Sequence, residues 1–257
     1  MTTSRSRLAA GCAALVLLAA GCAAGPRPGI ISTSRLGIAK PAGTVARGVV
    51  QLEAGYSQAH RDERTQHSIG ETLLRVGMGP RTEARIGISS YQRTVTPAAT
   101  VEGLADASVA VKHRLRDAAG WLPALAATAG TTIPTGANRV SASALQPEGS
   151  LAAEWTLPHG LRALAFAAHR EGIAAGDRFG QNTLAAAGRV IVAPGMIGHL
   201  ELSHASSTRQ GATDVYQLRA GAAARLTPSL QLDVWGGRTS SSGRHERLFG
   251  LGFARRW

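Results

Sequence analysis

Alternating apolar and polar residues recur in stretch after stretch from Gly48 to the last residue, and this layout limits the possible folds most strongly. Short turns and longer polar connections separate the stretches in turn. The predicted short turns lie at residues 79–82, 117–121, 158–160, 194–195 and 227–229, and the longer connections at 59–67, 92–103, 134–149, 171–181, 206–213 and 238–245. Short turns on one side and long loops on the other are typical of an antiparallel barrel that crosses an outer membrane.

The stretches between these connections predict twelve strands. They lie at residues 48–58, 68–78, 83–91, 104–116, 122–133, 150–157, 161–170, 182–193, 196–205, 214–226, 230–237 and 246–257. An even number of strands returns the C-terminus to the side at which the barrel begins. We therefore predict an all-β fold, a transmembrane antiparallel up-and-down β-barrel of about 12 strands, over residues 48–257.

The final strand places Phe249, Leu251 and Phe253 on one face and ends on Trp257. Alternation with period two and terminal aromatic residues suit a strand that has one face in lipid. An amphipathic strand of a soluble sheet would show the same alternation, so this segment alone does not decide between the two.

The N-terminus has the features of a secretory signal. Arg5 and Arg7 precede an apolar run at residues 8–20, and small residues follow it. Residues 1–21 are therefore predicted to be a signal peptide, and the mature protein leaves the cytoplasm. Residues 22–47 contain three prolines and no sustained period, which predicts either a periplasmic lead-in, that is a linker, or a short plug.

The end of this signal resembles a lipoprotein box, in which Cys22 would become the lipid-modified first residue of a lipoprotein. Ordinary cleavage after Ala24 is the alternative. The chain has two cysteines, Cys12 and Cys22, so the mature protein has at most one and forms no internal disulfide. Zinc-ligand and thiol-redox motifs are thereby excluded.

Apolar and charged side chains separate onto opposite faces of the predicted strands. The lipid-facing positions are Val50, Leu52, Ala54, Tyr56, Leu74, Val76, Met78, Ala84, Ile86, Ile88, Val109, Val111, Leu151, Ala153, Trp155, Leu157, Leu164, Phe166, Tyr216, Leu218, Leu230, Leu232 and Val234. A charge that faces the middle of the bilayer costs about 2–4 kcal/mol, which favours a polar interior. A soluble barrel would reverse the two faces, and the secretory signal favours the membrane barrel over it.

The other face supplies the predicted lumen-lining residues, seven acidic and seven basic. They are Glu53, Glu71, Arg75, Glu83, Arg85, Asp106, Lys112, Arg114, Glu154, Arg189, Glu201, Arg219, Arg225 and Asp233. Arg75 with Glu83 and Arg85 with Glu71 are candidate cross-strand ion pairs. A balanced network of this kind predicts a narrow, wet path without selectivity for anions. Its members either maintain the shape of the barrel or contact a passing solute.

The formal net charge of +12 falls to +10 once Arg5 and Arg7 leave with the predicted signal peptide, and this surplus is then carried by loops and chain ends. The arginines concerned are Arg139, Arg170, Arg178, Arg209, Arg238, Arg244, Arg255 and Arg256. They either lie in water or donate charge-assisted hydrogen bonds to the phosphates of lipopolysaccharide and other outer-membrane lipid. No basic helix or zinc knuckle supports binding to nucleic acid.

Motifs for catalysis are missing from the sequence. The eight histidines have no H-E-x-x-H spacing, and no G-x-S-x-G elbow occurs. Gly250-Leu-Gly252 lacks the third glycine of a dinucleotide loop. His199 and Glu201 share the inward face, but a single pair of this kind is more often structural than catalytic. We therefore expect no enzyme activity, no cofactor and no metal site.

Three segments resemble a known family of outer-membrane proteins, which is named for a MetA pathway of phenol degradation. They are residues 72–87, 103–115 and 132–136. The resemblance extends over about residues 48–257. It implies a porin-like barrel in the Gram-negative outer membrane with a transport role for small aromatic or other hydrophobic solutes.

The same resemblance implies that the barrel-assembly machinery recognises the end of the last strand, with Phe249, Leu251, Phe253 and Trp257 as its assembly signal. A lipid-anchored structural or envelope protein without transport activity is the alternative function, and an outer-membrane hydrolase is a third. The residues of the lumen do not specify the solute.

Overall fold

Strands make up nearly all the regular structure of the computed structural model, which describes residues 31–174 and 176–257. The elements are β1 (Val50–Arg61), β2 (Arg64–Ile69), β3 (Thr72–Gly77), β4 (Thr82–Ile88), β5 (Tyr91–Val95), β6 (Thr100–Leu104), β7 (Ala107–Arg116), β8 (Ala124–Ile133), β9 (Gln146–Thr156), the 3-10 helix η1 (Pro158–Gly160), β10 (Arg162–Ala174), β11 (Asp177–Ala193), β12 (Met196–Ser207), β13 (Val215–Thr227), β14 (Leu230–Ser241) and β15 (Arg244–Arg256). No helix among the described residues is long and apolar enough to cross a membrane.

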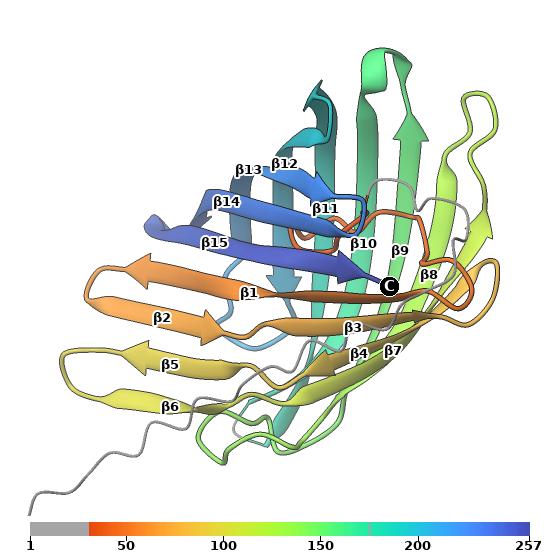
Figure 1. Cartoon of the computed structure of the whole chain (residues 1–257). Helices are drawn as coiled ribbons and strands as arrows, with labels where there is room; N and C mark the ends of the chain where they lie inside the picture. The colour runs from red at the N-terminus through yellow and green to blue at the C-terminus, as the bar shows by residue number, and fades with distance from the viewer. Residues whose placement is uncertain (1–30, 175) are drawn as a thin grey trace, which may run out of the picture.

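The strands form one antiparallel sheet that closes on itself (Figure 1). Closure is made by β1 and β15, which pair from Gln51 opposite Arg256 to His60 opposite Arg247. Three barrel strands consist of two segments each, namely β2 with β3, β4 with β5, and β6 with β7. Counted in this way, the barrel has twelve strands, which confirms the predicted all-β architecture.

The three interrupted strands break beside one another, at residues 70–71, 89–90 and 105–106. Gly70 has a φ of 72°, which allows the chain to leave the extended conformation there. Hydrogen bonds bridge the breaks, because the Glu71 amide donates to the Gly55 carbonyl and the Ala105 amide donates to the Ser90 carbonyl. The wall therefore stays closed while β2, β5 and β6 form an outer extension of it.

Several predicted long loops are in fact strand ends joined by tight hairpins. The connection at 59–67 is mostly β1 and β2, and the one at 92–103 contains parts of β5 and β6. The connection at 171–181 is likewise mostly β10 and β11, and the one at 238–245 is reduced to residues 242–243. Beyond the membrane both faces of a strand contact water, so the apolar–polar alternation that marks a strand is lost there.

Large apolar side chains cover much of the outer surface. Leu151, Leu184 and Leu202 are 60%, 58% and 64% exposed, and Phe249 and Leu251 are exposed as well. A continuous band of this kind suits lipid and not water.

The prediction that Leu164 and Phe166 face lipid is wrong. Both are buried inside the barrel, at 2% and 8% exposure, and alanines of β10 take the outward positions. Alanine is compatible with a lipid-facing and with a lumen-facing position. The sequence of β10 therefore does not show which of its faces points into the lumen.

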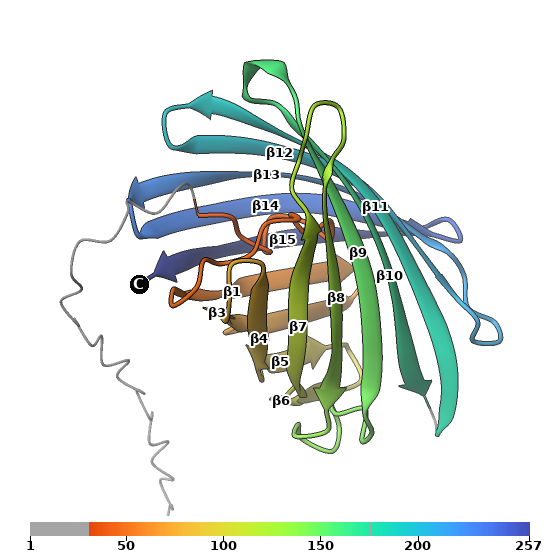
Figure 2. The same cartoon turned by 90° about the vertical axis from the view of Figure 1, so that its right-hand side faces the viewer.

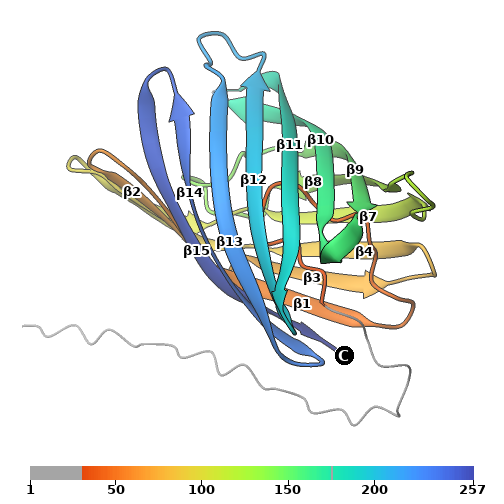
Figure 3. The same cartoon turned by 90° about the horizontal axis from the view of Figure 1, so that it is seen from above.

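Residues 31–45 lie within the ring of strands, and residues 46–47 are exposed at its rim; residues 31–47 are together called the plug below (Figures 2 and 3). Ile31, Leu36, Ala39, Ala42 and Val45 of the plug are at most 2% exposed. This part of the predicted linker is thus enclosed by the barrel. The predicted signal peptide at 1–21 and the lipidation site Cys22 lie outside the described residues.

Candidate functional site

The plug enters the lumen without pairing to any described strand, and acidic side chains of the wall bind its backbone. Glu201 of β12 accepts hydrogen bonds from the amides of Ile38 and Ala39, both at 2.8 Å. Glu154 of β9 accepts one from Ala42 at 2.9 Å.

Two further glutamates do the same on the opposite wall. Glu53 of β1 accepts from the Ser34 amide at 2.9 Å, and Glu83 of β4 accepts from the Val45 amide at 2.6 Å. A buried amide that has no partner costs about 1–3 kcal/mol, and hydrogen bonds to a charged acceptor are the stronger kind. The four carboxylates thus satisfy a backbone that has no ladder of its own.

Basic side chains bind the carbonyl groups of the plug. The Nζ of Lys112 donates to the carbonyls of Pro41 and Gly43. Arg75 donates to the Ser32 carbonyl at 2.7 Å and forms ion pairs with Glu53 and Glu83 at 3.0 and 2.8 Å. Each charge of this network therefore has an opposite charge or a backbone dipole beside it, as a buried ion requires.

Arg35 anchors the plug to the closing strands. Its guanidinium donates to the Leu251 carbonyl at 3.1 Å and lies 3.4 Å from Asp233. Gly55 of β1 and Gly252 of β15 make room for it, because a Cβ at these positions would lie 2.0 and 2.4 Å from guanidinium atoms. The two glycines therefore allow the Arg35 side chain to lie directly against the closing strands.

Lys40 forms hydrogen bonds within the plug. Its Nζ donates to the carbonyls of Ser34 and Gly37, both at 2.9 Å. Burial lowers the pKa of Lys40 to about 8, and the positive charges of Arg85 and Arg219 add to this effect.

An apolar patch on the inner wall receives one side of the plug. Leu164 and Phe166 of β10 pack there with alanines of β9 and β11, and Ala39 and Ile38 of the plug cover them. This contact explains why two large apolar residues face the lumen.

Cavities lie on both sides of the plug. One of about 350 Å³ lies between Ile31, Leu36 and the turns near Gly160 and Ile191. Another of about 440 Å³ is bordered by plug residues and by Glu71 and Trp235. Within the second cavity, the guanidinium of Arg219 lies 3.7 Å from the centre of the Trp235 ring.

The structure places the predicted lumen residues at three levels of burial. Those that are buried inside the barrel are Glu53, Arg75, Glu83, Lys112, Glu154, Arg189, Glu201 and Asp233. Those that are half-buried are Glu71, Arg85, Asp106, Arg114 and Arg219. Among the half-buried residues, Arg114 of β7 donates to the Pro80 carbonyl in the turn between β3 and β4. Arg225 is exposed near the end of β13.

The ion pair of Arg75 with Glu83 forms as predicted. Arg85 instead pairs with Glu83 at 2.8 Å and donates to the hydroxyl of Ser34, whereas Glu71 lies 3.7 Å from Arg35. The predicted pair of Arg85 with Glu71 is therefore wrong, because plug residues that the strand pattern did not consider take up both partners.

His199 and Glu201 face the lumen together, with 3.7 Å between the histidine Nε2 and a carboxylate oxygen. Arg189 donates to the other ring nitrogen at 3.3 Å. Both oxygens of Glu201 are already bonded to plug amides, so the pair helps to position the plug. Among residues 31–174 and 176–257, no group of three acidic, histidine or cysteine side chains is placed to hold a metal ion.

The strand pattern alone missed Arg35 and Lys40, which the plug contributes to the lumen. It also missed two lumen residues of the wall, Gln51 of β1 and Arg256 of β15. Gln51 donates to the Ser32 carbonyl at 3.1 Å, and Arg256 donates to Gln51 at 2.7 Å. The sequence does carry one signal for the plug, namely four inward-facing glutamates that need hydrogen-bond donors. The amides of residues 31–47, which precede the first strand, supply these donors.

A closed antiparallel barrel with an apolar outer band and a charged lumen defines the protein as an outer-membrane β-barrel. The sequence matches the family described as "Putative MetA-pathway of phenol degradation" over residues 33–257, and the chain belongs to this family. No protein with a curated description matches the chain.

Solved structures of similar fold include both channels and secretion domains. The COG4313 outer membrane channel from Pseudomonas putida F1 has a TM-score of 0.64 at 16% identity, covering 84% of this chain and 97% of that one. The NanC porin has 0.58 at 8% identity, covering 79% and 98%. The translocator domain of the autotransporter NalP from Neisseria meningitidis has 0.53 at 11% identity, covering 83% and 90%. These likenesses establish the fold.

Proposed function

We propose that the protein is an outer-membrane channel for small hydrophobic solutes, aromatic compounds among them, and that the plug closes it. The observation that carries this proposal is the way in which the plug is attached. Its contacts with the wall are hydrogen bonds, ion pairs and apolar packing, with no strand pairing among the described residues. The plug can therefore shift without breaking the ladder that closes the barrel.

The apolar patch supports the class of solute. When Ile38 and Ala39 move away, Leu164 and Phe166 become an apolar surface within a lumen that is otherwise charged. The ring of Trp235 lies in the cavity of about 440 Å³ beside the plug. Aromatic solutes gain free energy from contact with such surfaces. The name of the family, which refers to phenol degradation, agrees with this class.

A structural envelope protein without transport is the second candidate, and the filled lumen favours it. We propose no catalytic role. The His199 and Glu201 pair is enclosed beneath the plug, and its hydrogen bonds with the plug and Arg189 account for its position.

Uptake into proteoliposomes tests the proposal. Vesicles that contain the refolded protein should take up phenol faster than protein-free vesicles do. The increase in uptake rate that the protein causes should be larger for phenol than for glucose. Phe166→Gln should reduce the protein-dependent phenol uptake, while Phe179→Gln, which changes a ring near Gly172 and Arg209 away from the plug, should not. Gel electrophoresis of unheated samples verifies that each variant is folded, because a folded barrel resists the detergent and migrates as a separate band.

Protein-dependent uptake of neither solute would favour the structural role. Equal uptake of phenol by both phenylalanine variants would refute the assignment of the apolar patch to solute passage.

A further inference from the structure

A hollow of about 1030 Å³ lies on the outer surface of the barrel. Ala165, Ala167 and Ala186 form its floor, and Leu184 and Leu202 rise beside them with 58% and 64% of their surfaces exposed. These five residues have the outward orientation, opposite to that of the buried Phe166. The hollow therefore opens towards lipid and is separate from the lumen.

The hollow crosses several neighbouring strands along one row of residues that are opposite one another in the ladder. Ala165 is opposite Ala186, which is opposite Leu202, and the row continues through Leu218 to Arg238 of β14. Strands of membrane barrels are tilted by about 35–45°, so a row that crosses them changes its depth in the membrane.

The two ends of the row lie at different depths for this reason. Ala165 is near the start of β10, beside the short turn at residues 157–161, whereas Arg238 is near the far end of β14, before the hairpin at residues 242–243. The row thus leads from the apolar band to the rim opposite the short turns, which is the outer face of the membrane.

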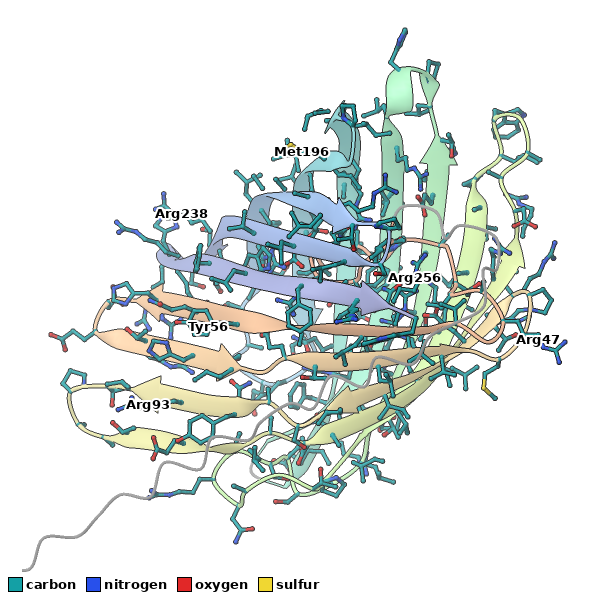
Figure 4. All side chains as sticks on the ribbon, viewed as in Figure 1. Arg47, Tyr56, Arg93, Met196, Arg238 and Arg256 are labelled. Atoms are coloured by element: carbon teal, nitrogen blue, oxygen red, sulfur yellow. The ribbon has the colours of Figure 1, made fainter. Side chains whose placement is uncertain are left out.

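The upper end of the hollow is cationic. Arg238 and His245 border it, and Arg247 of β15 lies directly opposite Arg238. Both arginine side chains are exposed, and neither forms an ion pair or a hydrogen bond with a group of the described residues. Like charges directly opposite each other destabilise a sheet, and an anion between them offsets that repulsion. Figure 4 shows Arg238 at the outer edge of β14.

Other charged groups near this end do not supply the anion. His60 of β1 lies opposite Arg247 and has no negative charge to offer. His204 lines the hollow and is bonded to Asp214 at 2.9 Å. Glu246 is opposite Thr239, which has the inward orientation.

We propose that the hollow binds one molecule of lipid A in the outer leaflet. Its phosphate lies between Arg238 and Arg247, whose planar guanidinium groups suit bidentate contact with phosphate oxygens. An acyl chain descends over the alanine floor between Leu184 and Leu202, where it buries apolar surface. This inference does not depend on the transport proposal, because the hollow lies on the opposite side of the wall from the plug.

Native mass spectrometry of the full-length refolded protein in detergent tests the site. With diphosphoryl lipid A as the probe, the protein should retain one molecule of the lipid. The double variant R238Q/R247Q should bind it about tenfold more weakly or worse, because two charge-assisted contacts are lost. Ala186→Leu fills the floor without changing any charge and should also weaken binding.

The matched control is R139Q/R225Q, which removes the same charge from two exposed arginines away from the hollow. It should bind lipid A as the unchanged protein does. Inorganic phosphate and a diacylglycerol serve as competitors that carry only the anion or only the acyl chains, and each should displace lipid A poorly. Equal loss in both double variants, or displacement by either competitor at the concentration of lipid A itself, would overturn the proposal.

Discussion

Glu201 shows at the scale of one residue how this lumen is organised. Its two oxygens bind consecutive amides of the plug, and its neighbour His199 lies on the same face. A sequence pattern can place Glu201 inside the barrel, since its parity is clear, but the pattern cannot name what the carboxylate binds. The partner is a backbone amide, and a backbone amide has no signature in the sequence.

Glu201→Gln should loosen the plug. A glutamine amide has one acceptor oxygen, so either the Ile38 or the Ala39 amide would face an NH₂ group, at a cost of about 1–3 kcal/mol. We expect the amides of residues 31–47 to exchange hydrogen roughly tenfold faster or more, as measured by mass spectrometry on the folded protein.

Glu148→Gln is the control for this change. Glu148 is exposed on β9 and contacts no plug amide among the described hydrogen bonds, so exchange within residues 31–47 should stay as in the unchanged protein. Identical exchange in the two variants would mean that the carboxylate of Glu201 does not hold the plug.

Among the elements, the strands could be predicted from the sequence because one side of each faces lipid. Period-two alternation therefore predicted twelve strands and, for most of them, which side faces lipid and which faces the lumen. It failed at β10, where alanines obscure the orientation of Leu164 and Phe166, and at the outer hairpins, where both faces contact water. The plug was foreseen only as one of two possibilities, because a segment without regular structure has no period to detect.

The last strand makes its own prediction at this scale. Trp257 exchanges two backbone hydrogen bonds with Val50, at 2.9 and 3.2 Å, and the residue is 39% exposed at the barrel rim. Deletion of Trp257 should lower the yield of folded barrel in vesicles that contain the assembly machinery. The free energy of unfolding of the molecules that do fold should fall by only about 1–3 kcal/mol.

Trp121→Ala provides the comparison, because Trp121 is 83% exposed in the turn between β7 and β8. It should leave the assembly yield unchanged. Normal assembly without Trp257 would argue against an assembly signal at the end of β15.

The whole molecule is a barrel whose lumen is filled by the chain that precedes it. The wall supplies carboxylates on β1, β4, β9 and β12, and the plug meets them from Ser34 to Val45. Because these contacts leave the ladder from β1 to β15 intact, the closed barrel and the closed lumen are separate properties of the molecule. A channel can therefore open while its wall stays folded.

The current through a planar bilayer tests this separation most directly. A variant that lacks residues 31–45 should fold, as verified by the detergent resistance of its barrel, and should conduct ions in a persistently open state. The unchanged protein should be closed for most of the recording and open only briefly. Equal conductance and open times in the two proteins would contradict the account, because the plug would then not be what closes the lumen.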